Sequence, residues 1–334
     1  MKKVFFLLMA VCLMSCGATG NDTEKFQTQR NKVVNVHDRV QAFDPGDFLF
    51  SRVAVLTVMG DYLVIQDSRN QEKLYHLYDR NSLRFLCSTG DKGQGPSELS
   101  GPWTPMYDRQ RHKFYAVDPN YKKVFSFDID SMMQNPDYLP VVKQEFVTSD
   151  EARSLLPKFY VNDTLTYGQV TEFYTDSRYR LVAMKWNMQT GQLWLNEHHQ
   201  GRRTYGYVAY SQWHKLVVES DGAYDLLTLL DDELNLKCYV KGPKWNEKRD
   251  NLHHFGAVAI YGDYILALYD GTLWNEANSP RICHVFDLEG NYVKTLDFDY
   301  NVHTISIDEE KARMYVSMDD VIQFGYLDLK GILD

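Results

Sequence analysis

A short strand-like stretch occurs six times along this chain at nearly constant spacing. The first copy is Asp61-Tyr-Leu-Val-Ile-Gln-Asp67. One apolar position can be aligned in all six copies, and the steps between successive copies are 51, 51, 51, 49 and 49 residues. The aligned positions are Leu63, Phe114, Leu165, Leu216, Ile265 and Met314. A repeat of about 40 to 50 residues built from short strands is typical of propeller blades.

The repeat predicts an all-β fold, a six-bladed β-propeller of four-stranded antiparallel blades. In the first repeat, strands are expected at 53–59, 62–67, 74–79 and 83–88, where apolar runs alternate with turn residues. The last repeat shows only three strands, which would leave backbone groups unpaired at its outer edge. The stretch Lys32–Val40 has the pattern of a spare strand. We therefore expect this N-terminal strand to pair with the last blade and close the ring.

The N-terminus has the features of a targeting segment. Lys2 and Lys3 precede an apolar run from Val4 to Leu13, which is too short to remain as a membrane helix. The tetrapeptide Leu13-Met-Ser-Cys16 follows at once and resembles a bacterial lipobox, in which cleavage before the cysteine leaves its thiol to carry diacylglycerol. The alternative is an ordinary secretory signal with a coincidental cysteine. The expected organisation is a signal peptide over 1–15, lipidated Cys16 with a flexible tether over 16–30, and the propeller over 31–334.

Charge and cysteine content restrict the possible partners. The formal charge is −9, and after loss of Lys2 and Lys3 the 34 basic and 45 acidic residues give −11. Because no block of lysines or arginines interrupts this acidic balance, nucleic acid is not expected as a partner. Cys87, Cys238 and Cys283 would remain in the folded part, without metal-site spacing. Buried free thiols are favoured, and a disulfide between two of the three stays open.

One glycine-rich stretch lies between the first and second repeats: Gly90-Asp-Lys-Gly-Gln-Gly-Pro-Ser-Glu98. A Gly-x-Gly-Pro-x-Glu turn after the first blade, behind a lipobox, resembles the TolB-like six-bladed propeller lipoproteins of Bacteroidetes. The resemblance implies the fold and an envelope location but no catalytic residues. A phosphate-binding loop is the alternative, yet the Gly-Lys-Ser/Thr ending is missing and Pro96 removes a donor. A tight turn with positive φ at Gly93 or Gly95 is favoured.

Strand order places the loops after each second strand, and the connections between blades, on one face of the ring. The richest loops there are 90–103, 196–205, 241–254 and 271–281. Their aromatic, arginine and histidine side chains are typical material of a recognition surface, although several could instead cap the core. The candidate ligand-binding residues are Trp103, Arg202, Arg203, Tyr205, Trp245, His253, His254 and Trp274, with Trp245 and Trp274 the first choices.

No catalytic site follows from the sequence. The pairs His198-His199 and His253-His254 lack the spacing that completes a metal site, and no Gly-x-Ser-x-Gly motif marks a serine hydrolase. Acidic residues that end strands could hold calcium in a lactonase or hydrolase, but they are also ordinary turn formers. These are Glu172, Asp221, Asp270 and Asp319.

The sequence therefore favours a binding or interaction module over an enzyme, with no cofactor and no metal. A protein partner and a glycan both remain open as the ligand. The domain is expected to be monomeric and to be held at the membrane by its N-terminal lipid. The expected location is the bacterial cell envelope, as an outer-membrane lipoprotein, on either the periplasmic or the surface side.

Overall fold

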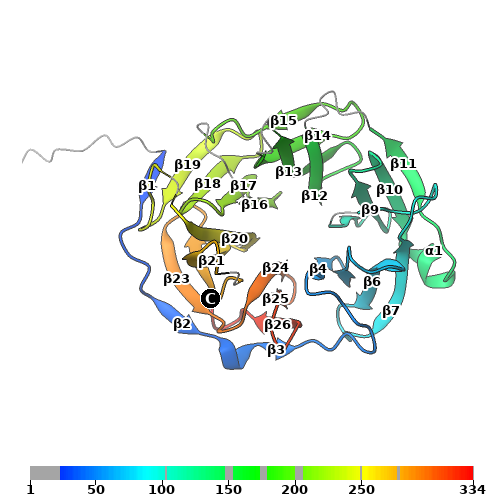
Figure 1. The fold of residues 1–334 in the computed structure, drawn as a ribbon, viewed down its shortest axis with the longest axis horizontal. Coiled ribbons are helices and arrows are strands. Elements are labelled where there is room, and N and C mark those ends of the chain that lie inside the picture. The colour runs from blue at the N-terminus through cyan, green and yellow to red at the C-terminus, as the bar shows by residue number, and fades with distance from the viewer. Residues whose placement is uncertain are drawn as a thin grey trace, which may run out of the picture.

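The computed structural model describes residues 23–101, 104–146, 153–173, 179–199, 206–248, 250–276 and 279–333. Six small antiparallel sheets stand around a central channel, each with its first strand beside the channel and its fourth at the rim (Figure 1). The chain is a six-bladed β-propeller, as the repeat predicts. No helix within the described ranges is long and apolar enough to cross a membrane.

The blades follow one another in chain order, with four consecutive strands in each of the first five. Blade 1 contains β4 (Val55–Met59), β5 (Tyr62–Gln66), β6 (Lys73–Asp79) and β7 (Phe85–Asp91). Blade 2 contains β8 (Met106–Asp108), β9 (Lys113–Asp118), β10 (Lys123–Asp128) and β11 (Val141–Glu145), with helix α1 (Ile129–Gln134) between its last two strands. Blade 3 contains β12 (Arg153–Tyr160), β13 (Leu165–Phe173), β14 (Tyr179–Asn187) and β15 (Leu193–Leu195).

Blade 4 contains β16 (Gly206–Ser211), β17 (Leu216–Asp221), β18 (Leu226–Asp231) and β19 (Leu236–Lys241). Blade 5 contains β20 (Leu252–Tyr261), β21 (Tyr264–Leu273), β22 (Ile282–Asp287) and β23 (Tyr292–Asp297). Blade 6 contains β24 (Val302–Asp308), β25 (Arg313–Met318) and β26 (Phe324–Asp328). All six aligned repeat positions lie in second strands, so the period of the sequence is the period of the blades.

The third strand of each blade ends on an Asp or Asn. In blades 1 to 5 this side chain accepts hydrogen bonds from backbone N–H groups of the turn that follows, as Asp79 does from Ser82 N at 2.6 Å. The six residues are Asp79, Asp128, Asn187, Asp231, Asp287 and Asp328. Short polar side chains that bond their own backbone favour turns over continued strands. These Asp and Asn side chains therefore mark the ends of the third strands, and in blade 2 Asp128 caps the start of α1.

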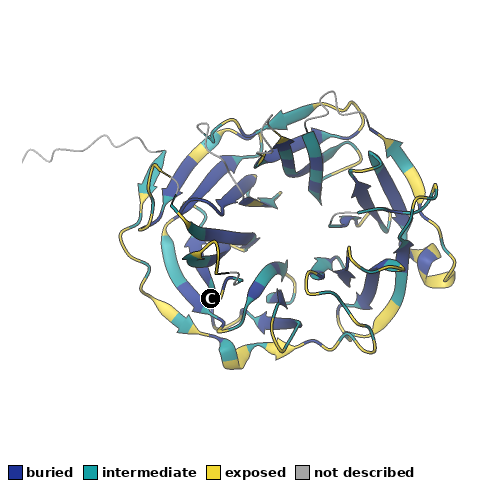
Figure 2. Cartoon of the chain, in the orientation of Figure 1, coloured by how far each residue is buried: buried dark blue, intermediate teal, exposed yellow. Residues whose placement is uncertain are grey.

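The core of the ring is divided among the interfaces between blades. Six clusters of buried apolar residues correspond to the six blade pairs. Figure 2 shows the buried residues running along the inner strands, with exposed residues gathered at the rim. The second strand of blade 1 is apolar on both sides because both of its faces meet a neighbouring blade, and Leu63, Val64 and Ile65 are all fully buried.

The N-terminal segment, residues 23–43, runs along the rim of blades 4, 5 and 6 (Figure 1). Its strand β1 (Glu24–Phe26) adds parallel to β19, and β2 (Val33–Asn35) adds parallel to β23. Its last strand, β3 (Gln41–Ala42), pairs antiparallel with β26 and completes blade 6. Ring closure by the N-terminus is thus confirmed.

The closing strand lies after the predicted stretch, because 32–40 serves blade 5 through β2 and then turns through the 3-10 helix η1 (His37–Arg39). Part of the expected tether is docked as well, since β1 already pairs with blade 4.

The N-terminal segment also places one buried side chain at each of three successive blade interfaces. Arg30 lies between blades 4 and 5, where its guanidinium meets Asp225 and three aromatic rings. Val36 belongs to the core between blades 5 and 6, and Phe43 to the core between blades 6 and 1. The segment is therefore part of the fold rather than a loose extension.

The glycine-rich stretch after blade 1 is a tight turn folded around Glu98. Glu98 accepts a hydrogen bond from Gly95 N at 2.8 Å, so the donor that an anion would need is already used. Positive φ occurs at Gly90 (+77°) rather than at the predicted Gly93 or Gly95. Gly93 leaves room for Glu98 instead, because a Cβ there would lie 1.8 Å from the Glu98 carboxylate and would displace it. A phosphate loop does not fit this geometry.

Candidate binding site on the loop face

The face that carries the blade connections is here called the loop face. Of the candidate residues from the sequence, Trp245, His253, His254 and Trp274 lie on this face within the described residues. The remaining candidates lie outside the described residues, and so does the lipobox cysteine. These are Cys16, Trp103, Arg202, Arg203 and Tyr205. Trp245 lies in the loop before β20 and Trp274 in the neighbouring loop after β21, while His253 and His254 lie at the start of β20 itself.

Trp274 and His253 form the most exposed aromatic pair of this group. Trp274 is 42% exposed, and its ring stands edge-on to the imidazole of His253 with 4.8 Å between centroids. His253 Nδ1 is hydrogen-bonded to Asp270 Oδ2 at 3.2 Å, and Thr272 donates to the other Asp270 oxygen at 2.6 Å. The Asp270 side chain is only 5% exposed. A buried carboxylate thus fixes the orientation of an imidazole that is only partly exposed and, through it, of the indole.

His254 points the opposite way from His253, as alternation along a strand requires. It is 1% exposed, and its Nε2 lies 3.1 Å from Asp250 while its Nδ1 lies 3.3 Å from the Tyr269 hydroxyl. Burial lowers the pKa of His254 from its ordinary value. His254 is therefore a buried structural residue, which makes it a poor candidate for direct ligand contact.

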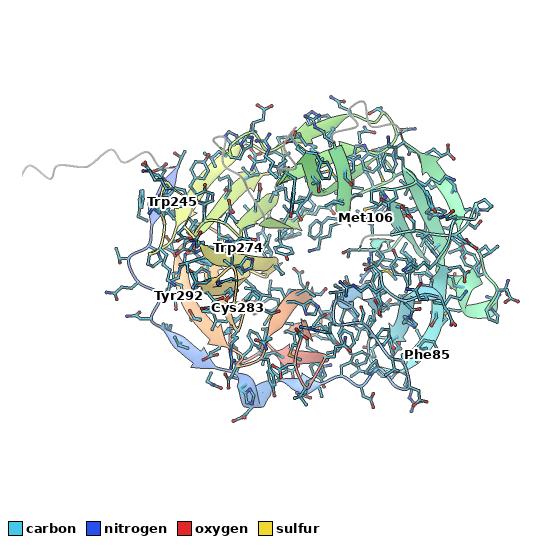
Figure 3. The ribbon with its side chains drawn as sticks, viewed as in Figure 1. Phe85, Met106, Trp245, Trp274, Cys283 and Tyr292 are labelled. Carbon is cyan, nitrogen blue, oxygen red and sulfur yellow. The ribbon has the colours of Figure 1, made fainter. Side chains whose placement is uncertain are left out.

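Trp245 does not join the Trp274 pair. Its ring packs on Tyr224 with 5.8 Å between centroids, and Lys241 Nζ lies 5.0 Å from the ring centre. Figure 3 places Trp245 toward the rim of blade 4 and Trp274 nearer the channel. The two loops still touch, because Lys244 Nζ donates to Gly271 O at 3.3 Å. The sequence thus predicts the two loops correctly, but the structure separates the two tryptophans.

The acidic residues considered as calcium ligands are engaged with protein groups. Glu172 forms ion pairs with Arg153 at 2.9 Å and Arg180 at 2.6 Å. Asp319 accepts from Arg52 at 2.8 Å, and Asp221 accepts from Ala223 N at 2.8 Å. In the part of the chain that the structure describes, no group of three His, Cys, Asp or Glu side chains could hold a metal ion.

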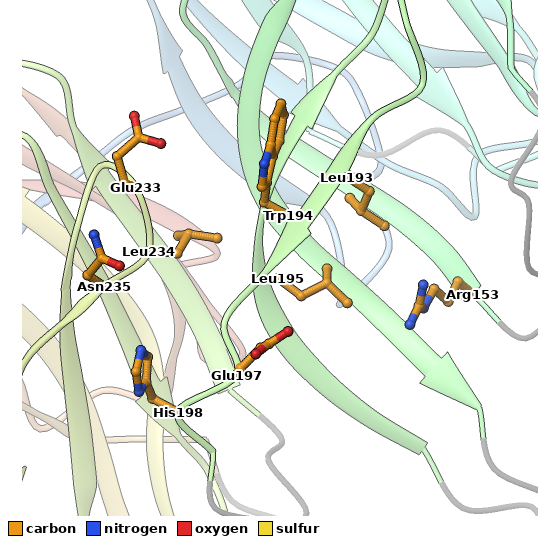
Figure 4. Close-up of a pocket in the computed structure, with 9 residues that line it drawn as sticks. All are labelled: Arg153, Leu193, Trp194, Leu195, Glu197, His198, Glu233, Leu234 and Asn235. Carbon is orange, nitrogen blue, oxygen red and sulfur yellow. The ribbon is translucent and has the colours of Figure 1, made fainter.

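A separate cavity of about 440 Å³ lies between the outer strand of blade 3 and blade 4 (Figure 4). Trp194 and the flanking leucines of β15 supply apolar surface, and Glu197, His198 and Asn235 supply polar groups. Lys185 bridges the two blades here through an ion pair with Glu233 at 2.6 Å. Of the four histidines discussed from the sequence, only His198 lines this cavity. The other lining residues come from two separate blades, so their proximity is not evident from the sequence.

The three cysteines of the ring are free thiols. Cys238 and Cys283 are buried and Cys87 is partly buried. Burial raises the pKa of Cys87 to about 11. A thiol with so high a pKa carries little thiolate at neutral pH, so Cys87 is a weak nucleophile.

Comparison with known proteins places the chain by fold. The sequence matches no protein-family model and no curated protein. A solved member of the DUF4221 family from Bacteroides vulgatus aligns with a TM-score of 0.55 at 9% identity, covering 86% of this chain and 94% of that one. A putative exported protein from Bacteroides fragilis aligns with a TM-score of 0.52 at 12% identity, covering 89% and 88%. These similarities support the propeller fold and nothing finer.

A third similar structure is described as a calcium-binding protein, regucalcin, from Agrobacterium tumefaciens. It aligns with a TM-score of 0.53 at 9% identity, covering 89% of this chain and 95% of that one. At this identity the likeness extends to the fold alone.

Sequence reasoning missed the groups that hold the site in place. Asp270 appears in the sequence only as a possible calcium ligand, whereas here it orients His253. Asp225 and Arg30 carry no motif, and 195 residues separate them along the chain. A signal for Asp225 does exist nearby: a Cβ on Gly242 would lie 2.1 Å from Asp225 Oδ1, so the glycine marks a close approach.

Proposed function

We propose that this protein is a lipid-anchored binding module of the bacterial cell envelope that holds a glycan on its loop face at Trp274. The observation that carries the proposal is the half-exposed indole of Trp274, set against His253 and fixed by buried Asp270. The face of an indole binds the apolar face of a sugar ring, while nearby polar groups bind its hydroxyls.

The geometry favours binding over catalysis. Asp270 fixes the imidazole before any ligand arrives, so little ordering cost would accompany binding. Among the described residues no hydrogen bond reaches His253 Nε2, which leaves that atom to bond a ligand hydroxyl. No described cluster favours the alternative, a calcium-dependent hydrolase, because the acids considered for it are bonded to protein groups.

Replacing Trp274 by alanine is expected to weaken glycan binding at least about tenfold, since a central aromatic contact contributes about 2 kcal/mol or more. The matched control is Trp213→Ala, because Trp213 is 89% exposed on the turn between β16 and β17, at the opposite face. Affinity for a panel of bacterial and plant oligosaccharides, measured by calorimetry, checks the expectation. Binding that survives Trp274→Ala, or that falls equally with Trp213→Ala, would count against the site. Selective binding of a polypeptide would replace the glycan as ligand.

The anchor is proposed from Leu13-Met-Ser-Cys16, and similarity in fold to an exported Bacteroides protein is compatible with it. Cys16→Ala is expected to abolish incorporation of radiolabelled palmitate and to shift the protein out of the membrane fraction. Labelling that persists in the variant would exclude Cys16 as the lipid site. Protease treatment of intact cells would then distinguish a periplasmic from a surface position.

A further inference from the structure

Arg30 is the most completely enclosed charged group of the N-terminal segment. Its side chain is 6% exposed, and its Nη1 donates to Asp225 Oδ1 at 2.7 Å. The guanidinium carbon lies 5.3 Å from the ring centre of Phe255 and 5.5 Å from those of Tyr269 and Phe286. A desolvated guanidinium group interacts strongly with the face of an aromatic ring. A residue from outside the repeats therefore occupies a cation site between blades 4 and 5.

The connection between blades 4 and 5 consists of residues 242–248 and Asp250. Two partners of Arg30, Asp225 and Tyr269, link the arginine to this connection. On one side, Asp225 Oδ2 accepts from Lys244 N at 3.0 Å, and Asp225 O accepts from Gly242 N at 2.8 Å. The bond from Trp245 N to Gly242 O, at 3.0 Å, continues the same turn. Arg30 thus holds the start of the connection through one carboxylate.

On the other side, the Tyr269 ring lies under the guanidinium, and its hydroxyl is 3.3 Å from His254 Nδ1. His254 Nε2 in turn contacts Asp250, which accepts from Leu252 N at 2.9 Å. The next residue is His253, the partner of Trp274. Contacts from a single arginine therefore reach both ends of the connection.

We propose that Arg30 is a positioning residue for the loop face. Residues 24–35, which pair with blades 4 and 5, are called the clasp. The connection that carries Trp245 and leads into His253 adopts its observed conformation only while the clasp is bound to these two blades. Because the same segment follows the proposed lipid anchor, the state of the anchor and the state of the site would be coupled. This coupling rests on the proposed function, but the clasp itself does not.

The test is hydrogen exchange on the full mature chain carrying Arg30→Ala. Amides of 242–248 and 250–252 are expected to exchange at least about tenfold faster, because they lose the group that holds both ends. The hairpins of blades 1 to 3 should keep their protection. Arg39→Ala is the matched control, since Arg39 belongs to the same segment but is exposed. A milder variant, Arg30→Lys, keeps the charge facing Asp225 and should give an intermediate effect.

Chemical rescue separates positioning from general stabilisation. Guanidinium ion at millimolar concentration should fill the vacated site in Arg30→Ala and restore slow exchange in the connection, with no effect on Arg39→Ala. Unchanged protection of the connection in Arg30→Ala would overturn the proposal, and so would equal loosening of all six blades. Neither readout uses a ligand, so failure to bind glycans would refute the proposed function and leave the clasp standing.

Discussion

A chain without residues 23–43 is expected to lose the single cooperative unfolding transition of the ring. The deletion removes β3, which leaves the outer edge of β26 unpaired, and removes Val36 and Phe43 from two blade interfaces. Truncating a buried phenylalanine alone costs about 3–5 kcal/mol, against a total stability of about 5–15 kcal/mol for a typical domain. Circular dichroism during urea and thermal unfolding would show a broad transition at lower denaturant and temperature.

Two single substitutions sharpen this expectation. Phe43→Ala, at a position 3% exposed, should lower the free energy of unfolding by about 3–5 kcal/mol. Phe26→Ala lies in the same segment at 65% exposure and should change it by less than about 0.5 kcal/mol. A truncated chain that melts like the intact one would show that closure does not depend on the N-terminus.

Replacing Arg80 by methionine is expected to weaken the interface between blades 6 and 1 and to lower the free energy of unfolding by about 3–5 kcal/mol. Arg80 Nη1 donates to Asp308 Oδ1 at 3.0 Å, and the Asp308 side chain is fully buried. Removing the arginine leaves this carboxylate buried without its cation, and such a charge is costly. Arg80 also pairs with Glu310 at 2.6 Å, so one side chain links two acids of blade 6.

The control for Arg80→Met is Arg52→Met. Arg52 also bridges blades 6 and 1, through Asp319, but its side chain is 78% exposed. Exposed pairs of this kind contribute about 0–1 kcal/mol, so little loss is expected. The double variant Arg80→Met with Asp308→Leu should regain part of the stability, because both charges are then removed. A loss below about 1 kcal/mol for Arg80→Met would contradict the role given to the buried pair.

The pH dependence of stability gives a second measurement at the interface between blades 6 and 1. Hydrogen bonds from Arg80, and then from Arg109, lower the pKa of Glu310 from 4.5 to about 2. A carboxyl whose pKa is depressed on folding stabilises the protein above its ordinary pKa, and this contribution disappears as the pH falls toward the folded value. Stability should therefore fall between about pH 4.5 and pH 2. Arg80→Met should weaken this dependence.

The blade pattern could be predicted from the sequence because it depends on local rules. Leu63 and its five equivalents repeat at the spacing of a blade, and the Asp or Asn after each third strand sets a turn through its own backbone. The candidates Trp274 and His253 are visible for the same reason, since Trp274 directly follows the predictable strand β21 and His253 lies at the start of β20. Their mutual orientation is not visible, because it depends on a side-chain hydrogen bond to Asp270 within the neighbouring strand β21.

The N-terminal stretch shows where local rules stop. Its apolar alternation correctly indicates a strand that joins the ring, but alternation alone cannot choose between the open edges of blades 5 and 6. The choice depends on how far the chain must travel around the rim, which places Val33–Asn35 on one blade and Gln41–Ala42 on the next.

By itself, the sequence determined the six blades, their strand order, closure by the N-terminus and the loops that form the loop face. These follow from hydrophobic period and turn chemistry, which act over a few residues. Only the tertiary structure decided that Arg30 meets Asp225, that Arg80 meets Asp308, and that Trp274 rather than Trp245 stands beside His253. The two arginine contacts join segments that are far apart in the sequence, and assembly of the ring brings them together without leaving a periodic trace in it. The Trp274 contact forms within blade 5, where β20 pairs with β21, and it depends on side-chain packing that the hydrophobic pattern does not specify.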